Sequence, residues 1–153
     1  SYQISNSITI IALPSNLIID FYNYNKNNKE FKIFGNDIVF SENYSNKSFS
    51  IDDISGTIKH GDIYNINIVT NKGRSSLTAQ GYIDTQNEYL EGNIEFSFSD
   101  PKDIKRLFHI FGINIEENPI TNLLIYRGKI DLTFEDGMSL LGPLPIGRAP
   151  KLK

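Results

Sequence analysis

Apolar and polar side chains alternate along most of this chain, which is the period-2 pattern of half-buried β-strands. The alternation is visible in residues 17–22, 64–68 and 77–81. It is clearest in residues 90–98, where one face carries Leu90, Gly92, Ile94, Phe96 and Phe98. The pattern predicts an antiparallel meander with one dry face and one solvated face.

Two stretches break the alternation. Residues 31–40 read either as one strand interrupted near Gly35-Asn36-Asp37 or as two short strands. Residues 49–59 carry Ile51, Ile54 and Ile58 but lose strict alternation at Gly56. A glycine inside a strand pattern favours a β-bulge at that position.

The spacing of apolar residues changes to a helical period after residue 100. Asp100 is a good N-cap, Pro101 fits the first helical position and Asp103 stands where its charge favours a helix N-terminus. The apolar positions of the predicted helix are Ile104, Leu107, Phe108 and Phe111, and Gly112 is a natural terminator. We expect one amphipathic helix near residues 101–111, lying on the dry side of the sheet. Residues 113–124 are ambiguous, and 121–125 fit a second short helix or a strand.

Asp136-Gly137 between two apolar runs is a strong hairpin signal. A two-residue turn there pairs Leu132 with Leu141 and Phe134 with Ser139. We therefore predict a mainly β fold: a single domain spanning residues 1–153, with a curved antiparallel sheet that is an open half-barrel or sandwich-like.

Composition narrows the function classes. The 153 residues include no cysteine, which excludes disulfides and cysteine-based zinc sites. The formal charge of −3 comes from mixed acidic and basic residues, so we expect no nucleic-acid partner. The apolar runs are far shorter than the about 20 residues that span a bilayer.

The sequence offers little catalytic chemistry. His60 falls in a predicted turn and His109 at the edge of the helix stripe, with nothing to bring them together. The carboxylate pairs are Asp52-Asp53, which a strand would point to opposite faces, and Glu116-Glu117 in a proline-containing loop. Nucleophile-elbow, phosphate-loop, dinucleotide and zinc-protease motifs are absent. We expect no enzyme activity, no metal and no cofactor.

The dry face is rich in aromatic residues, which fits either an ordinary filled core or an open groove for an acyl chain. The candidate ligand-binding residues are Leu90, Ile94, Phe96, Phe98, Leu107, Phe108 and Phe111. The same residue types build a core and a groove, so the pattern leaves both open.

The C-terminal stretch GKIDLTFEDGMSLLGPLPIGRAPKL, residues 128–152, carries a family resemblance. It resembles the end of a family of uncharacterised alphaproteobacterial envelope proteins, which finish with a strand, Asp-Gly and a Leu-Gly-Pro-(Leu/Ile)-Pro-Leu-Gly-x-Ala-Pro-x-Leu run. The matching positions are Asp136, Gly137, Leu141, Gly142, Pro143, Leu144, Pro145, Ile146, Gly147, Ala149, Pro150 and Leu152. That family is broadly similar to AsmA-type proteins, whose rhythm of strand, glycine-containing turn and strand fits residues 77–98.

The resemblance implies a bacterial periplasmic or cell-envelope domain, the C-terminal part of a longer protein anchored to the membrane by a segment before Ser1. AsmA-like relatives are associated with moving or organising lipids, so a lipid or acyl chain is the expected partner. The alternative is a protein interaction or secretion-associated module that docks another envelope protein by an edge strand or by the proline-rich tail. The tail prolines cannot donate to a strand ladder, so we also expect them to cap a sheet edge.

Overall fold

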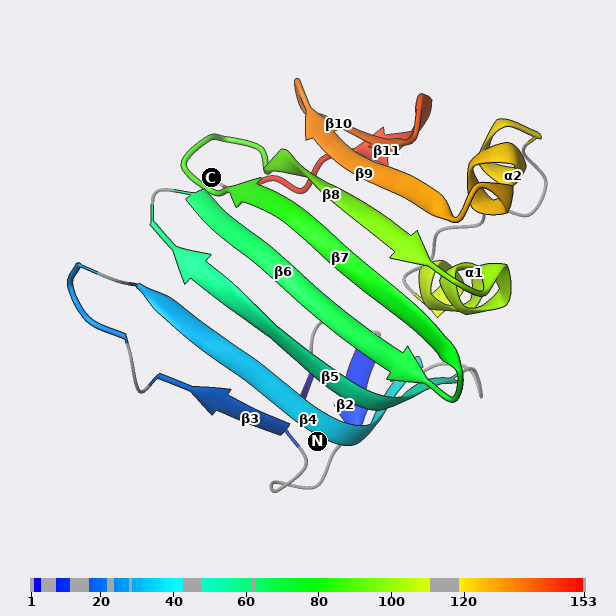
Figure 1. The fold of residues 1–153 in the computed structure, drawn as a ribbon. Helices are drawn as coiled ribbons and strands as arrows, with labels where there is room; N and C mark the ends of the chain where they lie inside the picture. The colour runs from blue at the N-terminus through cyan, green and yellow to red at the C-terminus, as the bar shows by residue number, and fades with distance from the viewer. Residues whose placement is uncertain are drawn as a thin grey trace.

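The computed structural model describes residues 2–3, 8–11, 17–21, 24–27, 29–42, 48–61, 63–110 and 119–152. Within these residues, eleven antiparallel strands form one open sheet, and two helices follow the eighth strand (Figure 1). The strands are β1 (Tyr2–Gln3), β2 (Ile8–Ile11), β3 (Leu17–Asp20), β4 (Glu30–Glu42), β5 (Ser48–His60), β6 (Ile63–Lys72), β7 (Ser75–Asp84), β8 (Glu91–Phe98), β9 (Lys129–Glu135), β10 (Met138–Leu141) and β11 (Leu144–Arg148). The helices are α1 (Pro101–Ile110) and α2 (Pro119–Tyr126).

The order of strands in the sheet follows the sequence. From β4 to β11 each strand pairs with the next one along the chain, while β2 and β3 both pair with β4 along different parts of its length. The predicted mainly β fold with a curved antiparallel sheet is confirmed.

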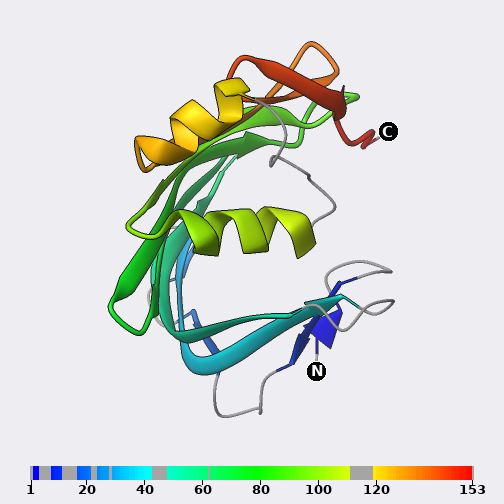
Figure 2. The same cartoon turned by 90° about the vertical axis from the view of Figure 1, so that its right-hand side faces the viewer.

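Helix α1 lies on one side of the sheet and contacts β4, β5 and β8. Figure 2 shows β8 and β9 on one side of α1 and the long strands β4 and β5 on the other, so the sheet curves around the helix. In Figure 1, α1 and α2 stand together at one end of the strands. The helices therefore close one end of the curved sheet.

A bend in β4 and β5 produces part of this curvature. Asp37 has a positive φ of 51°, and the β4–β5 pairing passes over it. Inward-facing residues of a regular strand are two positions apart. At the bend the interval is three positions, from Gly35 to Ile38 in β4 and from Ile51 to Ile54 in β5. The interruption predicted near Gly35-Asn36-Asp37 is thus a bend within one continuous strand.

The bulge predicted at Gly56 is wrong, because Gly56 pairs in unbroken register with β4 and β6. Gly56, Gly81 and Gly92 instead permit close strand approach. A Cβ on Gly81 would overlap the Asn93 carbonyl oxygen, and the other two glycines meet neighbouring backbone in the same way. Glycines at such positions allow a sheet to coil more tightly than side chains permit.

The predicted helix is confirmed as α1, with Asp100 as its N-cap: the Asp100 carboxylate accepts a hydrogen bond from the Lys102 N–H at 3.0 Å. Asp103 is buried and accepts a 2.6 Å hydrogen bond from the Ser75 hydroxyl, which ties the helix to β7. Phe111 and Gly112 lie outside the described residues. In the ambiguous segment the structure has a second helix, α2, beginning at Pro119.

The predicted hairpin is also confirmed. Asp136 and Gly137 both have positive φ, 51° and 77°, as a type I′ turn requires. The paired residues are Leu132 with Leu141 and Phe134 with Ser139, as the two-residue turn demands.

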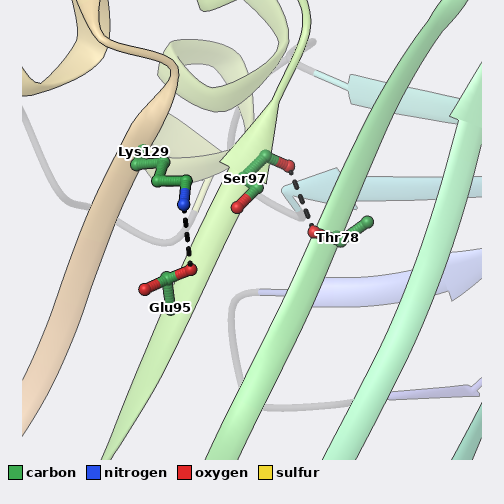
Figure 3. A network of polar contacts seen from close by, with 4 residues as sticks. All are labelled: Thr78, Glu95, Ser97 and Lys129. Atoms are coloured by element: carbon green, nitrogen blue, oxygen red, sulfur yellow. Dashed lines mark hydrogen bonds and ion pairs between the residues drawn. The ribbon is translucent and has the colours of Figure 1, made fainter.

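The solvated face of the sheet carries short polar contacts between neighbouring strands. Figure 3 shows the Lys129 ammonium 3.9 Å from Glu95 Oε1 and the Thr78 hydroxyl donating to the Ser97 carbonyl oxygen at 3.5 Å. The Asn93 amide donates to the Thr133 hydroxyl at 2.7 Å on the same face. The exposed Lys129–Glu95 ion pair contributes little stability, and the buried hydrophobic cluster lies on the opposite face.

Candidate functional site

The apolar face of the sheet is continuous across the meander. Strand register places one residue of each strand from β4 to β10 in a single row, and paired residues share a face. The row is Phe31, Ile58, Ile66, Gly81, Ile94, Leu132 and Leu141. Seven strands at about 4.8 Å spacing make this row about 29 Å long.

The helices cover one end of that face and form the core there. The buried cluster consists of Leu77, Phe98, Ile104, Phe108, Ile125, Ile130 and Leu141. Phe96, Leu107, Leu124 and Leu132 pack against it, and the Phe96 and Phe108 rings meet edge to face with centroids 5.3 Å apart. The structure therefore places Phe96, Phe98, Leu107 and Phe108, four of the candidate ligand residues, in the core beneath the helices.

The face continues beyond this cluster toward the other end of the strands. Ile58, Ile66, Ile83, Ile94 and Phe134 lie there, half-buried and outside the cluster. Of the candidate residues, Ile94 belongs to this part. Leu90 precedes β8 and donates its N–H to the Pro150 carbonyl at 2.9 Å, while Phe111 lies outside the described residues.

A hollow of about 240 Å³ adjoins this part of the face at the C-terminal edge. Its lining residues are Leu132, Phe134, Ser139, Ile146, Gly147, Arg148 and Pro150. Sequence reasoning singled out neither this hollow nor Leu132 as a ligand residue, although the alternation in β9 places Leu132 and Phe134 on the apolar face.

The tail with the family-like signature is built into the sheet. Gly142 and Pro143 form the turn between β10 and β11, Pro145 stands opposite Leu140, and the register shifts just before Leu140 on β10. Beyond β11, the Ala149 and Leu152 N–H groups donate to the carbonyl oxygens of Gly137 and Glu88. The tail backbone is thus bonded to its own chain up to Leu152.

The structure does not bring the two histidines together. His60 ends β5, at the end of the sheet away from α1, whereas His109 is exposed on α1 (Figure 1). Within the described residues, no group of three or more His, Cys, Asp or Glu side chains is arranged to hold a metal ion.

Asp52 and Asp53 are both exposed, so the expectation that they point to opposite faces is wrong. The bend at Asp37 removes the alternation between Ile51 and Ile54, which leaves both carboxylates outside. They bind the β6–β7 hairpin: Asp53 accepts from the Asn71 amide at 2.7 Å and Asp52 from the Gly73 N–H. Glu116-Glu117 lies outside the described residues.

The protein is an open antiparallel sheet, and its two helices cover one end of the apolar face of that sheet. The chain matches no protein-family model, no curated protein and no solved structure. Neither of the two described helices has the length and apolarity needed to cross a membrane.

Proposed function

We propose that this domain is a non-enzymatic module of the bacterial cell envelope that binds the acyl chain of a lipid along the apolar face of its sheet. One observation carries the proposal: the apolar row continues past the helix-covered cluster, through Ile94, Ile66 and Ile58 to Phe31. The half-buried part of the row outside the covered cluster is where we place the acyl chain.

The dimensions and energetics suit an acyl chain. The row follows the curve of the sheet from strand to strand, and the apolar hollow beside Phe134 and Ile146 adjoins it at the C-terminal edge. Each methylene transferred from water contributes about 0.8 kcal/mol, so burying about ten of them contributes roughly 8 kcal/mol before the entropic cost of binding. The resemblance of the C-terminal tail to envelope proteins supports the proposed location in the cell envelope.

A fluorescent fatty acid, cis-parinaric acid, tests the proposal directly, because the chain has no Trp to interfere with its signal. We expect saturable binding that unlabelled palmitate displaces. Ile66→Lys places a charge on the apolar face and should weaken binding at least tenfold, a loss of about 1.4 kcal/mol or more. Asn67→Lys, the next residue on the solvated face of the same strand, is the matched control and should bind like the wild type.

Thermal unfolding of both variants checks that each is folded. Solvent extraction of the purified protein followed by mass spectrometry should also find co-purified lipid. The proposal fails if palmitate does not bind saturably, or if Ile66→Lys and Asn67→Lys bind palmitate equally well.

A second candidate function is docking of another protein chain at the edge strand β3. β3 pairs with β4, and no described strand pairs with its other side. Ile18, Ile19 and Phe21 are 43%, 49% and 54% exposed, and Ile18 stands opposite the exposed Phe34. An apolar, proline-free edge favours strand addition. At the opposite edge, β11 contains Pro145, and the tail beyond β11 is bonded internally.

The specific form we propose for this candidate is pairing of β3 with β3 of a second copy. Sedimentation equilibrium should show a concentration-dependent dimer that Ile19→Lys abolishes. Ile146→Lys, which adds the same charge at the β11 edge, should leave the dimer intact. A monomer at every concentration, or equal effects of both variants, contradicts this candidate.

A further inference from the structure

A basic pocket of about 540 Å³ lies at the end of the sheet away from α1. Three segments that are distant in sequence build it: the β3–β4 loop, the end of β5 with its turn, and the β7–β8 loop. The lining residues are Lys26, Asn27, Lys29, Lys59, His60, Gly61 and Gln86. In Figure 1 these loops gather at the end opposite the two helices.

Among the described residues that line the pocket are three lysines and one histidine, and none of them is a carboxylate. The ion pairs of Lys129 with Glu95 and of Lys151 with Glu88 use no lysine of the pocket. The Asp84 carboxylate, at the end of β7, accepts hydrogen bonds from the Gln86 N–H and the Asn87 amide. Glu30 lies with Lys59 along a neighbouring hollow on the solvated face. The pocket therefore has an excess of positive charge for an anion.

Backbone hydrogen bonds hold the segments around the pocket together. The His60 N–H donates to the Lys29 carbonyl at 2.7 Å, which joins the end of β5 to the β3–β4 loop. Within the β3–β4 loop, the Asn27 N–H donates to the Asn25 side-chain oxygen at 2.8 Å. Less reorganisation is then needed to bring the lysines to one ligand.

His60 connects the pocket to the apolar face. Its ring stacks on Tyr64 with centroids 4.4 Å apart, and register places His60, Tyr64 and Ile83 on the apolar side of β5, β6 and β7. The basic pocket therefore adjoins the end of the apolar row at Phe31 and Ile58, while the helix-covered cluster, which includes Leu141, lies at the other end of the row.

We propose that this pocket binds the anionic headgroup, a phosphate or carboxylate, of the amphiphile whose acyl chain lies along the apolar face. This inference rests on the proposed function. Lysine ammonium groups form charge-assisted hydrogen bonds to phosphate oxygens and act as point charges without demanding one geometry. An amphiphile then lies with its chain toward the helices and its charged end among Lys26, Lys29 and Lys59.

The test compares two lipids that share a palmitoyl chain, lysophosphatidic acid and zwitterionic lysophosphatidylcholine, below their micelle concentrations. Displacement of cis-parinaric acid should show at least tenfold tighter binding of lysophosphatidic acid, and the difference should shrink at high salt. In Lys29→Gln/Lys59→Gln this preference should disappear while lysophosphatidylcholine binds as before. Lys59→Arg, which keeps the charge, should retain the preference.

The matched control is Lys102→Gln/Lys105→Gln on α1, which removes the same net charge at the other end of the sheet and should keep the preference. Equal wild-type binding of the two lipids overturns the headgroup site and leaves acyl-chain binding standing. Absence of binding to either lipid overturns both. Inorganic phosphate that binds as tightly as lysophosphatidic acid, with the same loss in Lys29→Gln/Lys59→Gln, identifies a free-anion site and overturns the headgroup assignment.

Discussion

The side chain of Leu124 in α2 packs directly against the bare Cα of Gly142 in the turn between β10 and β11. A Cβ built at Gly142 would overlap Leu124 Cδ1, and Gly142 also has a positive φ of 60°. This contact joins the second helix to the C-terminal hairpin and explains why one position of the tail signature has no side chain.

Gly142→Ala should therefore destabilise the domain through two effects. The left-handed backbone costs about 1 kcal/mol for a residue with a Cβ, and overpacking against Leu124 costs roughly 1–3 kcal/mol more. Gly73→Ala is the matched control, because Gly73 has a φ of 58° and nothing within 4 Å of a built Cβ. Urea unfolding should show the larger loss for Gly142→Ala. Equal losses would show that Leu124 accommodates the methyl group freely.

Gly81→Ala should be among the most damaging small substitutions in the sheet. Its Cβ would overlap the Asn93 carbonyl oxygen of β8, so the strands must separate, at a cost of about 3 kcal/mol or more in the free energy of unfolding. Gly61→Ala is the comparison: its nearest contact would be the Ile63 carbonyl oxygen at 3.8 Å. Chemical denaturation should place Gly61→Ala within about 0.5 kcal/mol of the wild type. A stable Gly81→Ala would contradict the close approach of β7 and β8.

Phe108→Ala should cost about 3–5 kcal/mol of unfolding free energy, because Phe108 is 3% exposed and sits in the core between α1 and the sheet. A double-mutant cycle with Phe96→Ala should give a coupling of about 0.5–1.5 kcal/mol for the edge-to-face ring pair. Leu123→Ala, on the 53% exposed outer side of α2, should change stability by less than about 0.5 kcal/mol. No measurable coupling would mean that the rings do not meet.

Ser75→Ala removes the hydroxyl that donates to the buried Asp103 carboxylate at 2.6 Å. An incompletely satisfied buried carboxylate costs about 1–3 kcal/mol, so thermal unfolding should shift to lower temperature. Ser55→Ala, exposed on β5, is the control and should unfold like the wild type. If both variants unfold alike, the Ser75 bond does not hold α1 to β7.

Local signals accounted for the features that the sequence predicted well. Asp136-Gly137 specifies its turn through two neighbouring residues, and the turn length then sets the pairing of Leu132 with Leu141. Asp100 likewise caps α1 through contacts within one turn of helix. These elements need no knowledge of the rest of the chain.

The bend at Asp37 could not be located from the pattern, because Ile51 and Ile54 fit either a bulge at Gly56 or a shift at Asp52-Asp53. The left-handed conformation of Asp37 in β4 places the shift at Asp52-Asp53. The sequence of β5 does not contain that information, because Asp37 belongs to the neighbouring strand.

The extent of the candidate site could not be predicted from the sequence either. Alternation identified the face that carries Ile94, Phe96 and Phe98, but only the position of α1 separates the covered core residues Phe96 and Phe98 from Ile94. The basic pocket gave no signal, because Lys29, Lys59 and Gln86 are far apart in the sequence and only the folded sheet brings their loops and strand ends together.

The meander has a consequence for how the chain folds. From β4 onward each strand pairs with its neighbour in sequence, so the hairpins from β4 to β8 and from β9 to β11 can form as they leave the ribosome, whereas β8 and β9 must pair across residues 99–128. The contact of α1 with β4 and β5 is also long-range, since it joins the helix to strands that were synthesised well before it. We therefore expect the sheet to assemble progressively and the docking of α1 to complete cooperative folding late, after β9 and β10 have formed.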